Sequence, residues 1–133
     1  MGTKNSTQDY RSALKKAKNH GSAKHGSGHW MAQRVTAIAL IPLTVWFVYS
    51  VIRLAGSSHA DFVMWLQHPF NAIAMILFVI ASFYHGVLGS QVVVEDYIHT
   101  EWFKTLKLIA NKLFFFALGT ACIFSILKIA FGG

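Results

Sequence analysis

Acidic residues, cysteine and proline are scarce in this sequence. Its 133 residues include five Asp and Glu, one Cys and two Pro, and 13% of them are charged. A single cysteine, Cys122, excludes a disulfide within the chain and argues against a cysteine-based metal site. Because Cys122 lies inside an apolar run, we interpret it as a small buried apolar residue. The shortage of charge, together with an apolar share of 54%, is typical of a membrane protein and not of a soluble domain.

The N-terminal part of the chain is polar and basic. The net charge is +7, and seven of the twelve Lys and Arg residues, from Lys4 to Arg34, precede the first apolar run. No nucleic-acid-binding motif accompanies this charge, so we interpret it as a flank that sets membrane topology. The polar start lacks the early apolar region of a secretory signal peptide, whereas its Ser and basic residues leave a mitochondrial presequence open. We predict a flexible basic segment over residues 1–28 and a membrane-anchor domain over residues 29–133.

Three apolar segments are long enough to cross a bilayer. They run from about 35 to 52, from about 70 to 94 and from about 108 to 131. Pro69 suits the first turn of the second helix, and Pro42 inside the first segment predicts a kink and not a break. The expected fold is therefore an all-α membrane protein with three transmembrane helices.

The distribution of Lys and Arg predicts how these helices are oriented. The N-terminal flank is rich in them, whereas the first loop holds only Arg53, opposed by Asp61. The second loop holds Lys104, Lys107 and Lys112. Because Lys and Arg are enriched on the cytoplasmic side, we expect the N-terminus and the second loop inside, and the first loop and the C-terminus outside. The bacterial inner membrane is the expected location, and the mitochondrial inner membrane is the alternative.

His85 lies within the second apolar segment. An ionisable side chain in hydrocarbon is costly and needs a reason, which leaves three roles: metal or haem ligand, proton relay, or hydrogen-bonded structural group. On a helix, residues at alternating steps of four and three share one face. The face that contains His85 consists of Asn71, Met75, Phe78, Ser82, His85, Gly89, Val92 and Asp96. Because it holds nearly all the polar or small residues of the segment, we expect it to look into a helix bundle.

A haem ligand at this depth needs flat space beside it for the macrocycle, and Gly86 and Gly89 could leave that space. The first and third segments contain no second inward-facing histidine. If His85 binds haem through two histidines, the other ligand must come from another chain. Four other histidines lie near or beyond the predicted membrane boundaries; they are His29, His59, His68 and His99.

The pair Asp96-Tyr97 lies where the second helix leaves the membrane. The eleven residues from His85 to Asp96 return a helix to within roughly 20° of the same face and advance it by about 16 Å. A tyrosine hydroxyl can donate a hydrogen bond to a quinone carbonyl, and a carboxylate can orient an arginine or join a proton path. The alternative is that both residues are interfacial anchors. Arg34 could pair with a propionate group of a haem or stabilise a quinone site. The alternative is a flanking residue whose side chain snorkels to the membrane surface and fixes topology.

Together these features resemble the small membrane-anchor subunit, of the D-subunit type, of succinate dehydrogenase (respiratory complex II). The resemblance covers nearly everything after residue 26. It includes Gly28-His29-Trp30, then Gln33-Arg34-Val35-Thr36-Ala37-Ile38, followed by the three spans. Its most specific part is His85, ten intervening residues, and then Asp96-Tyr97.

The resemblance implies partners and cofactors. In this family the anchor packs with a second three-helix anchor subunit, a cytochrome b subunit, around one haem b held between histidines, one from each subunit. The two anchors dock a flavoprotein and an iron–sulfur subunit on the inner face, and electrons from succinate pass to ubiquinone. We therefore expect a subunit of succinate:ubiquinone oxidoreductase, with no residue for succinate chemistry in this chain.

The resemblance also implies the site residues. His85 would be an axial ligand of the haem iron. Tyr97 would hydrogen-bond a quinone carbonyl, and Asp96 would help to organise that site. Arg34 would lie near a haem propionate and the quinone pocket. His29, from a region that varies between branches of the family, is also assigned to the haem.

Two other functions are compatible with the same sequence. A haem b subunit of another membrane dehydrogenase, or of fumarate reductase, would keep His85 as a ligand. For another dehydrogenase the Asp96-Tyr97 pair would not be needed. A structural or assembly membrane protein would leave His85 hydrogen-bonded and would bind no haem.

Overall fold

The structure is a computed structural model, and it describes residues 23–132. The predicted flexible segment over residues 1–28 falls largely outside these residues, and its last part, from residue 23 onward, is helical. The chain divides into two compact units after Met31, and the helix packing that positions the candidate site belongs to the second unit.

Four helices make up most of the described chain. They are α2 (Ala23–Leu54), α3 (His59–Gln67), α4 (Pro69–Tyr97) and α5 (Glu101–Ala130), and residues 23–132 contain no strand. Three helices are long and apolar enough to cross a membrane: α2 from Gly26 onward, α4 and α5. The predicted all-α fold with three membrane-spanning helices is therefore confirmed.

The helices extend beyond the predicted spans. α5 begins at Glu101 and not near residue 108, and α2 begins well before residue 35. The 29 residues of α4 make a helix of about 44 Å, whereas the hydrocarbon core of a bilayer is about 30 Å thick. An apolar run marks only the part of a helix that lies in hydrocarbon. Polar residues continue the helix into the headgroup region, which is why the helices are longer than the spans predicted from hydropathy.

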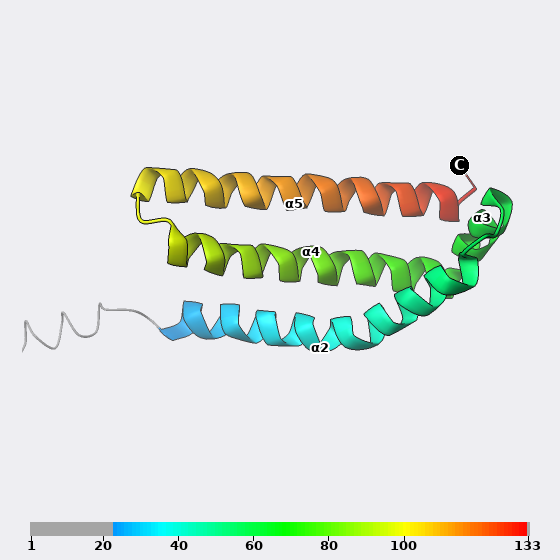
Figure 1. The fold of residues 1–133 in the computed structure, drawn as a ribbon, viewed down its shortest axis with the longest axis horizontal. Helices are drawn as coiled ribbons and strands as arrows, with labels where there is room; N and C mark the ends of the chain where they lie inside the picture. Colours follow the sequence, from blue (N-terminus) through cyan, green and yellow to red (C-terminus); the bar gives the residue numbers. More distant parts are fainter. Residues whose placement is uncertain (1–22, 133) are drawn as a thin grey trace, which may run out of the picture. The chain divides into compact units, whose positions relative to one another are not determined.

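The two prolines occupy different helix positions. Pro69 is the first residue of α4, where its missing N–H costs no intrahelical hydrogen bond. Pro42 lies inside α2, which continues past it. The ribbon of α2 bends in its cyan part (Figure 1), as expected where a proline ring pushes against a backbone carbonyl of the preceding turn. The predicted kink without a break agrees with this path.

A short helix, α3, lies between the first two spans, where the sequence analysis identified no helix. The Ser58 hydroxyl accepts a hydrogen bond from the Asp61 N–H (3.2 Å), and the Asp61 carboxylate accepts one from the Ser58 N–H (3.0 Å). This reciprocal capping box starts the helix. Leu66 is only 2% exposed, and Trp65 stacks on Trp46 of α2 with ring centroids 5.8 Å apart. The sequence did not reveal this helix because an apolar pattern of nine residues is too short for a clear periodicity.

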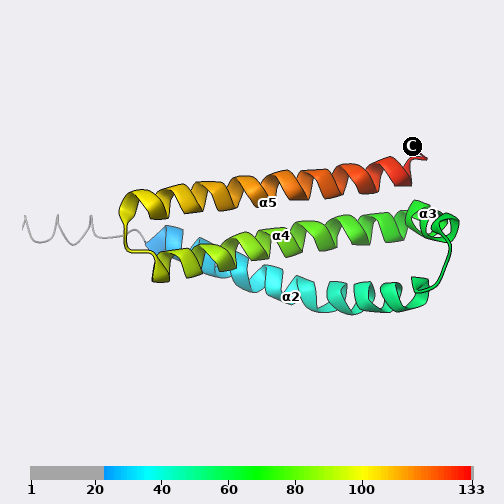
Figure 2. The same ribbon diagram turned by 45° about the horizontal axis from the view of Figure 1, so that its top comes forward.

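Within the second unit α4 lies between α2 and α5, as two views of the ribbon agree (Figure 1 and Figure 2). Aromatic rings cover glycines where α4 meets α5. A Cβ atom added at Gly86 would come within 3.2 Å of the Phe115 ring, and one added at Gly119 would come within 3.2 Å of the Phe83 ring. Each helix therefore supplies a glycine for the phenylalanine of the other, and this lets the two helices approach closely.

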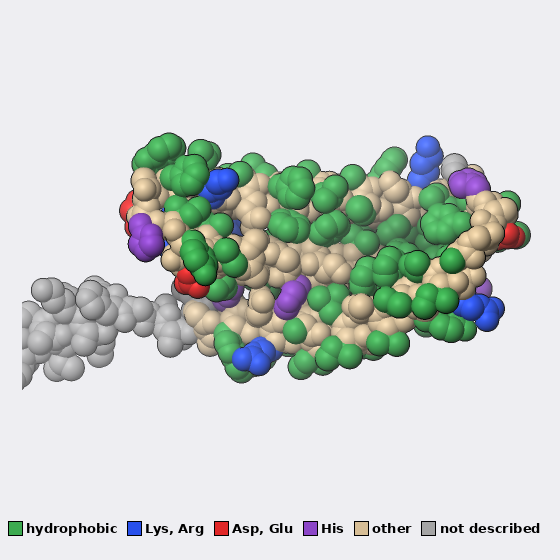
Figure 3. Space-filling view, in the orientation of Figure 1, with side chains coloured by type: hydrophobic (Ala, Val, Ile, Leu, Met, Phe, Trp, Pro, Cys, Tyr) green, Lys and Arg blue, Asp and Glu red, His purple; other side chains and the backbone are tan. Residues whose placement is uncertain are grey.

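Most of the apolar surface of the second unit is not covered by the chain itself. In Figure 3 hydrophobic side chains lie along α4 and α5, and charged side chains gather near the ends of these helices. The buried apolar residues of the described chain are Leu66, Ala72, Ala74, Leu88 and Ile126. An exposed apolar surface of this extent needs lipid or another subunit to cover it.

Candidate functional site

The polar face of α4 predicted from the sequence turns toward α2. Phe78 of this face stacks on Phe47 of α2, with ring centroids 4.5 Å apart. About two turns further along α4, the imidazole of His85 meets the hydroxyl of Thr36. This part of the face looks into the helix bundle, as predicted.

His85 lies in the middle part of α4 and is half-buried. Its Nδ1 atom is 3.0 Å from Oγ1 of Thr36. The same hydroxyl lies 2.8 Å from the carbonyl oxygen of Ala32 and 3.1 Å from that of Gln33. The Thr36 hydroxyl therefore stands between two backbone acceptors on its own helix and the imidazole on α4.

The number of protons in this cluster selects a histidine tautomer. A threonine hydroxyl has one proton to donate and can accept two hydrogen bonds. Each of the two carbonyl oxygens can accept the Thr36 proton, and when it is directed to one of them, Oγ1 is left to accept from the imidazole. The contact with His85 is then a hydrogen bond that Nδ1–H donates to Oγ1. In the neutral imidazole this tautomer leaves the lone pair on Nε2, the arrangement that suits a histidine ligand.

The two glycines near His85 do not play the same part. Gly86 was expected to leave room for a macrocycle, but the ring of Phe115 covers it at 3.2 Å from the position of a Cβ atom. That part of the prediction is wrong, because a residue of α5 fills the space that the missing side chain leaves. Gly89 faces α2, where the Nε2 atom of Gln33 lies 3.8 Å from the position of a Cβ atom. Only Gly89 shares the side of α4 that carries His85.

Gln33 carries a polar atom that lacks a partner. Its Oε1 atom is buried and has no hydrogen bond within the described part of the chain. Buried polar atoms are normally satisfied, so a group outside residues 23–132 is expected to complete this one. A side-chain amide offers both a donor and an acceptor, and its two ends can be exchanged by rotation. It therefore fits a polar group of a cofactor or of a second subunit.

Asp96 and Tyr97 are the last two residues of α4. Because α4 is continuous, Asp96 keeps its predicted place on the face of His85, about 16 Å along the axis. Tyr97 is 79% exposed, and neither side chain forms a hydrogen bond or ion pair with any described residue. The neighbouring Glu95, by contrast, accepts a hydrogen bond from Gln91 at 2.8 Å. A carboxylate near a helix C-terminus is disfavoured by the helix dipole, so helix stability does not explain Asp96.

Arg34 is not brought onto the face of His85. Arg34 is exposed, and the two residues that separate it from Thr36 turn a helix by about 200°, which places it on the other side of α2. His29 belongs to the first compact unit. Its Nε2 atom is buried and has no hydrogen-bond partner among the described residues. Within the second unit, the structure therefore brings Thr36 to His85 and leaves Arg34 apart.

Sequence reasoning assigned no role to Thr36 or Gln33. They lie three residues apart on one face of α2, and this spacing is the signal that could have identified them. Between α4 and α5, Asn111 Nδ2 donates to Ser90 Oγ at 2.7 Å, and such bonds between membrane helices are worth about 0.6 kcal/mol on average. Residues 23–132 contain no group of three or more His, Cys, Asp or Glu that could hold a metal ion. A metal at His85 would thus need ligand atoms that these residues do not supply.

The chain is similar to known proteins along most of its length. The family model of the succinate dehydrogenase/fumarate reductase transmembrane subunit matches residues 8–127. A succinate dehydrogenase hydrophobic membrane anchor subunit from Rickettsia bellii is 44% identical over 109 residues, which cover 81% of this chain and 86% of the relative. A protein of the same description from Paracoccus denitrificans is 30% identical over 123 residues, which cover 92% and 95%. No solved structure matches the chain.

Proposed function

This chain belongs to the family of succinate dehydrogenase hydrophobic membrane anchor subunits, and on that basis we propose that it helps to bind haem b and ubiquinone. As an anchor subunit it is part of a membrane complex with other subunits. The proposed partners are a second anchor subunit of cytochrome b type, an iron–sulfur subunit and a flavoprotein. The last two would dock where α4 ends at Tyr97, on the side proposed to be the inner one.

The hydrogen bond between His85 and Thr36 carries the proposal. It engages Nδ1 and leaves the lone pair on Nε2, at a half-buried position in the middle part of a membrane-spanning helix. From Ala32 onward the membrane helices of this chain contain no other histidine. A second histidine ligand would therefore come from the partner anchor subunit, and the haem would be shared by the two chains.

Several residues fit the haem when it is bound. Haem b supplies one-electron transfer. Thr36 fixes the orientation and tautomer of the His85 imidazole, and the Gln33 amide offers a hydrogen bond on the same side of α2. Arg34 is assigned to a propionate, which a guanidinium can bind through charge-assisted hydrogen bonds. The family resemblance also assigns His29 to the haem.

Asp96 and Tyr97 form the proposed quinone-binding end of α4. The exposed Tyr97 hydroxyl can donate a hydrogen bond to a quinone carbonyl. Reduction of a quinone consumes protons, and the Asp96 carboxyl group belongs to the residue before Tyr97, where it can deliver them. Neither side chain is engaged by the described part of this chain, so both can contact a ligand or the iron–sulfur subunit.

Replacement of His85 tests the haem assignment. In the purified complex His85→Ala should lose most of the haem b absorbance, because one axial ligand is removed, while the subunit composition is kept. His99→Ala is the matched control, since His99 lies in the connection between α4 and α5 and should not change the spectrum. An unchanged spectrum for His85→Ala would remove this residue as a ligand.

Replacement of Tyr97 tests the quinone assignment. Tyr97→Phe keeps the ring and removes one hydrogen-bond donor, so succinate–quinone reductase activity should fall about tenfold. Succinate oxidation with a water-soluble artificial acceptor should persist, because that reaction bypasses the quinone. Tyr49→Phe is the matched control and should leave both activities intact, because Tyr49 lies near the C-terminal end of α2 and not at the end of α4. An equal loss of both activities in Tyr97→Phe would indicate failed assembly instead.

A second candidate function is a structural anchor that binds no haem. The hydrogen bond between Thr36 and His85 favours the structural anchor, because it satisfies one nitrogen of the imidazole without a haem. Haem analysis of the purified wild-type complex separates the two functions. A complex that contains flavoprotein and iron–sulfur subunits but no haem would support the structural anchor.

A further inference from the structure

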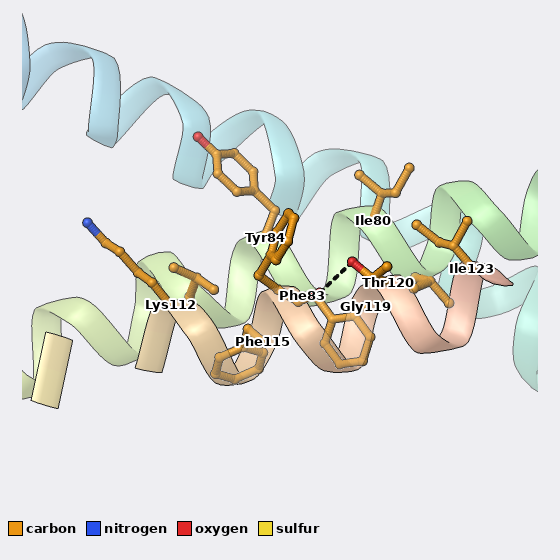
Figure 4. A pocket seen from close by; sticks show the side chains of 11 residues that line it. Ile80, Phe83, Tyr84, Lys112, Phe115, Gly119, Thr120 and Ile123 are labelled. Carbon is orange, nitrogen blue, oxygen red and sulfur yellow. Dashed lines mark hydrogen bonds between the residues drawn. The ribbon is translucent and has the colours of Figure 1, made fainter. Parts of the chain in front are cut away.

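A groove runs between α4 and α5 on the outer surface of the helix pair. It encloses about 370 Å³, and Figure 4 shows its lining. The rings of Phe83 and Phe115 meet edge to face, with centroids 5.9 Å apart, and Gly119 lies against Phe83. The Thr120 hydroxyl, also at the groove, is engaged by the carbonyl oxygen of Phe116 on its own helix at 2.8 Å. The walls of the groove are thus almost wholly apolar.

The groove is separate from the candidate haem face. On an α-helix the α4 residues of the lining point, on average, roughly 170° away from His85; they are Val79, Ile80, Phe83, Tyr84 and Val87. The partner of His85 is on α2, whereas the other wall of the groove is α5. A ligand in the groove would therefore not compete with a haem at His85.

One end of the groove carries a cation. Lys112 lines it, is exposed, and has no hydrogen bond or ion pair within the described residues. In Figure 4 the Lys112 ammonium and the Tyr84 hydroxyl both point out past the same end of the groove. These groups can pair with an anion and donate a hydrogen bond to it.

The depth of Lys112 corresponds to the headgroup boundary. The 30 residues of α5 span about 45 Å, about 15 Å more than the hydrocarbon core. The polar residues Glu101, Lys104 and Lys107 occupy the first turns of α5, so the excess length lies at this end. Hydrocarbon then begins about ten residues into α5, close to Lys112.

The length of the groove matches one acyl chain. From Lys112 to Ile123, the last lining residue, α5 advances about 16 Å, and half of a bilayer core is about 15 Å. We propose that the groove binds one acyl chain of an anionic phospholipid and that Lys112 and Tyr84 bind its phosphate. Any lipid chain fills an apolar groove, but the unpaired ammonium at its end favours a headgroup with net negative charge.

Lipid retention by the assembled complex tests this site. The complex is exchanged into bilayers with equal parts of phosphatidylglycerol and phosphatidylethanolamine of identical chains, purified, and its retained lipids are counted by native mass spectrometry. The wild-type complex should retain phosphatidylglycerol preferentially. Lys112→Gln should reduce that retention about fivefold, as expected for one lost lysine contact at the membrane surface. Lys128→Gln, at the other end of α5, is the matched control and should have no effect.

A second variant separates the groove from its charge. Thr120→Trp places a bulky ring at the exposed edge of the groove and should also lower phosphatidylglycerol retention, with the subunit composition unchanged. Equal retention of both lipids by the wild type, or full retention by Lys112→Gln, would overturn the proposal. A photo-crosslinking residue at position 120 that attaches to another subunit instead of lipid would overturn it as well. None of these results depends on haem or quinone binding.

Discussion

The Thr36 hydroxyl is the group of α2 that contacts the His85 imidazole. Its Oγ1 atom lies within 3.1 Å of three atoms: the carbonyl oxygens of Ala32 and Gln33 and the Nδ1 atom of His85. With its single proton directed to a carbonyl, Oγ1 accepts from Nδ1–H and leaves Nε2 as the ligand atom. Thr36 is thus a positioning residue for the proposed haem ligand, acting through the tautomer of His85.

Thr36→Val keeps the shape of the side chain and removes the hydroxyl. If His85 is a haem ligand, we expect haem affinity to fall roughly tenfold, as for other groups that orient a metal-ligating histidine. The electron paramagnetic resonance signal of the haem that remains should shift, because the imidazole is less firmly held. Thr36→Ser should restore the wild-type signal. Identical signals in wild type and Thr36→Val would refute this role without touching the haem assignment itself.

At the scale of the element, α3 depends on the charge of Asp61. Its carboxylate accepts hydrogen bonds from the Ser58 hydroxyl (2.7 Å) and from the Ser58 N–H (3.0 Å). The hydrogen bond from the Ser58 side chain, and then the one from its backbone, hold the pKa of Asp61 below its usual value of 3.8. The folded capping box therefore binds a proton less tightly than the unfolded segment does.

The stability of α3 should consequently fall in acid. The contribution of Asp61 is complete above pH 3.8 and is lost as the pH falls through the lowered pKa of the folded state. Hydrogen exchange at the α3 amides, corrected for intrinsic rates, should show less protection at acid pH. Asp61→Asn keeps an acceptor oxygen without an ionisable proton, so its protection should not change over this range. Protection that falls equally in both proteins would exclude Asp61 as the cause.

At the scale of the whole molecule, the helices of the second unit form an antiparallel arrangement in which α4 is central. α2 contacts it through Phe47 and Thr36, and α5 contacts it through Phe115 and Asn111. The turn at Gly56, which has a positive φ of 81°, and the short α4–α5 connection bring the chain back across the membrane. Three spans put the two ends of this unit on opposite sides of the bilayer.

Cysteine labelling tests the predicted orientation. In a Cys122→Ser background, Ser57→Cys precedes α3 and His99→Cys follows α4, so the two positions lie at opposite ends of α4. A membrane-impermeant maleimide should label Ser57→Cys in intact cells stripped of their outer membrane. It should label His99→Cys only after lysis, because the lysine-rich connection is expected inside. The reverse pattern would overturn the orientation.

The periodicity of the second apolar segment predicted the face of α4 correctly because helix geometry is local. His85, Phe78 and Asp96 share a side whatever packs against them. The same periodicity could not reveal that Phe115 fills the space at Gly86, since that contact joins residues far apart in the sequence. It also missed α3, whose capping box and Trp65 stack on α2 stabilise a helix too short for a clear pattern.

The sequence by itself determined that this protein crosses a membrane three times and carries a histidine in one of its spans. Hydrophobic length and residue spacing decide both, because hydrocarbon thickness and helix pitch are constants. Only the tertiary structure decided that Thr36 meets Nδ1 of His85 and that α4 and α5 enclose a groove ending at Lys112. The register between helices comes from the fit of side chains on remote segments, such as Phe83 against Gly119. No pattern within a single helix contains that information.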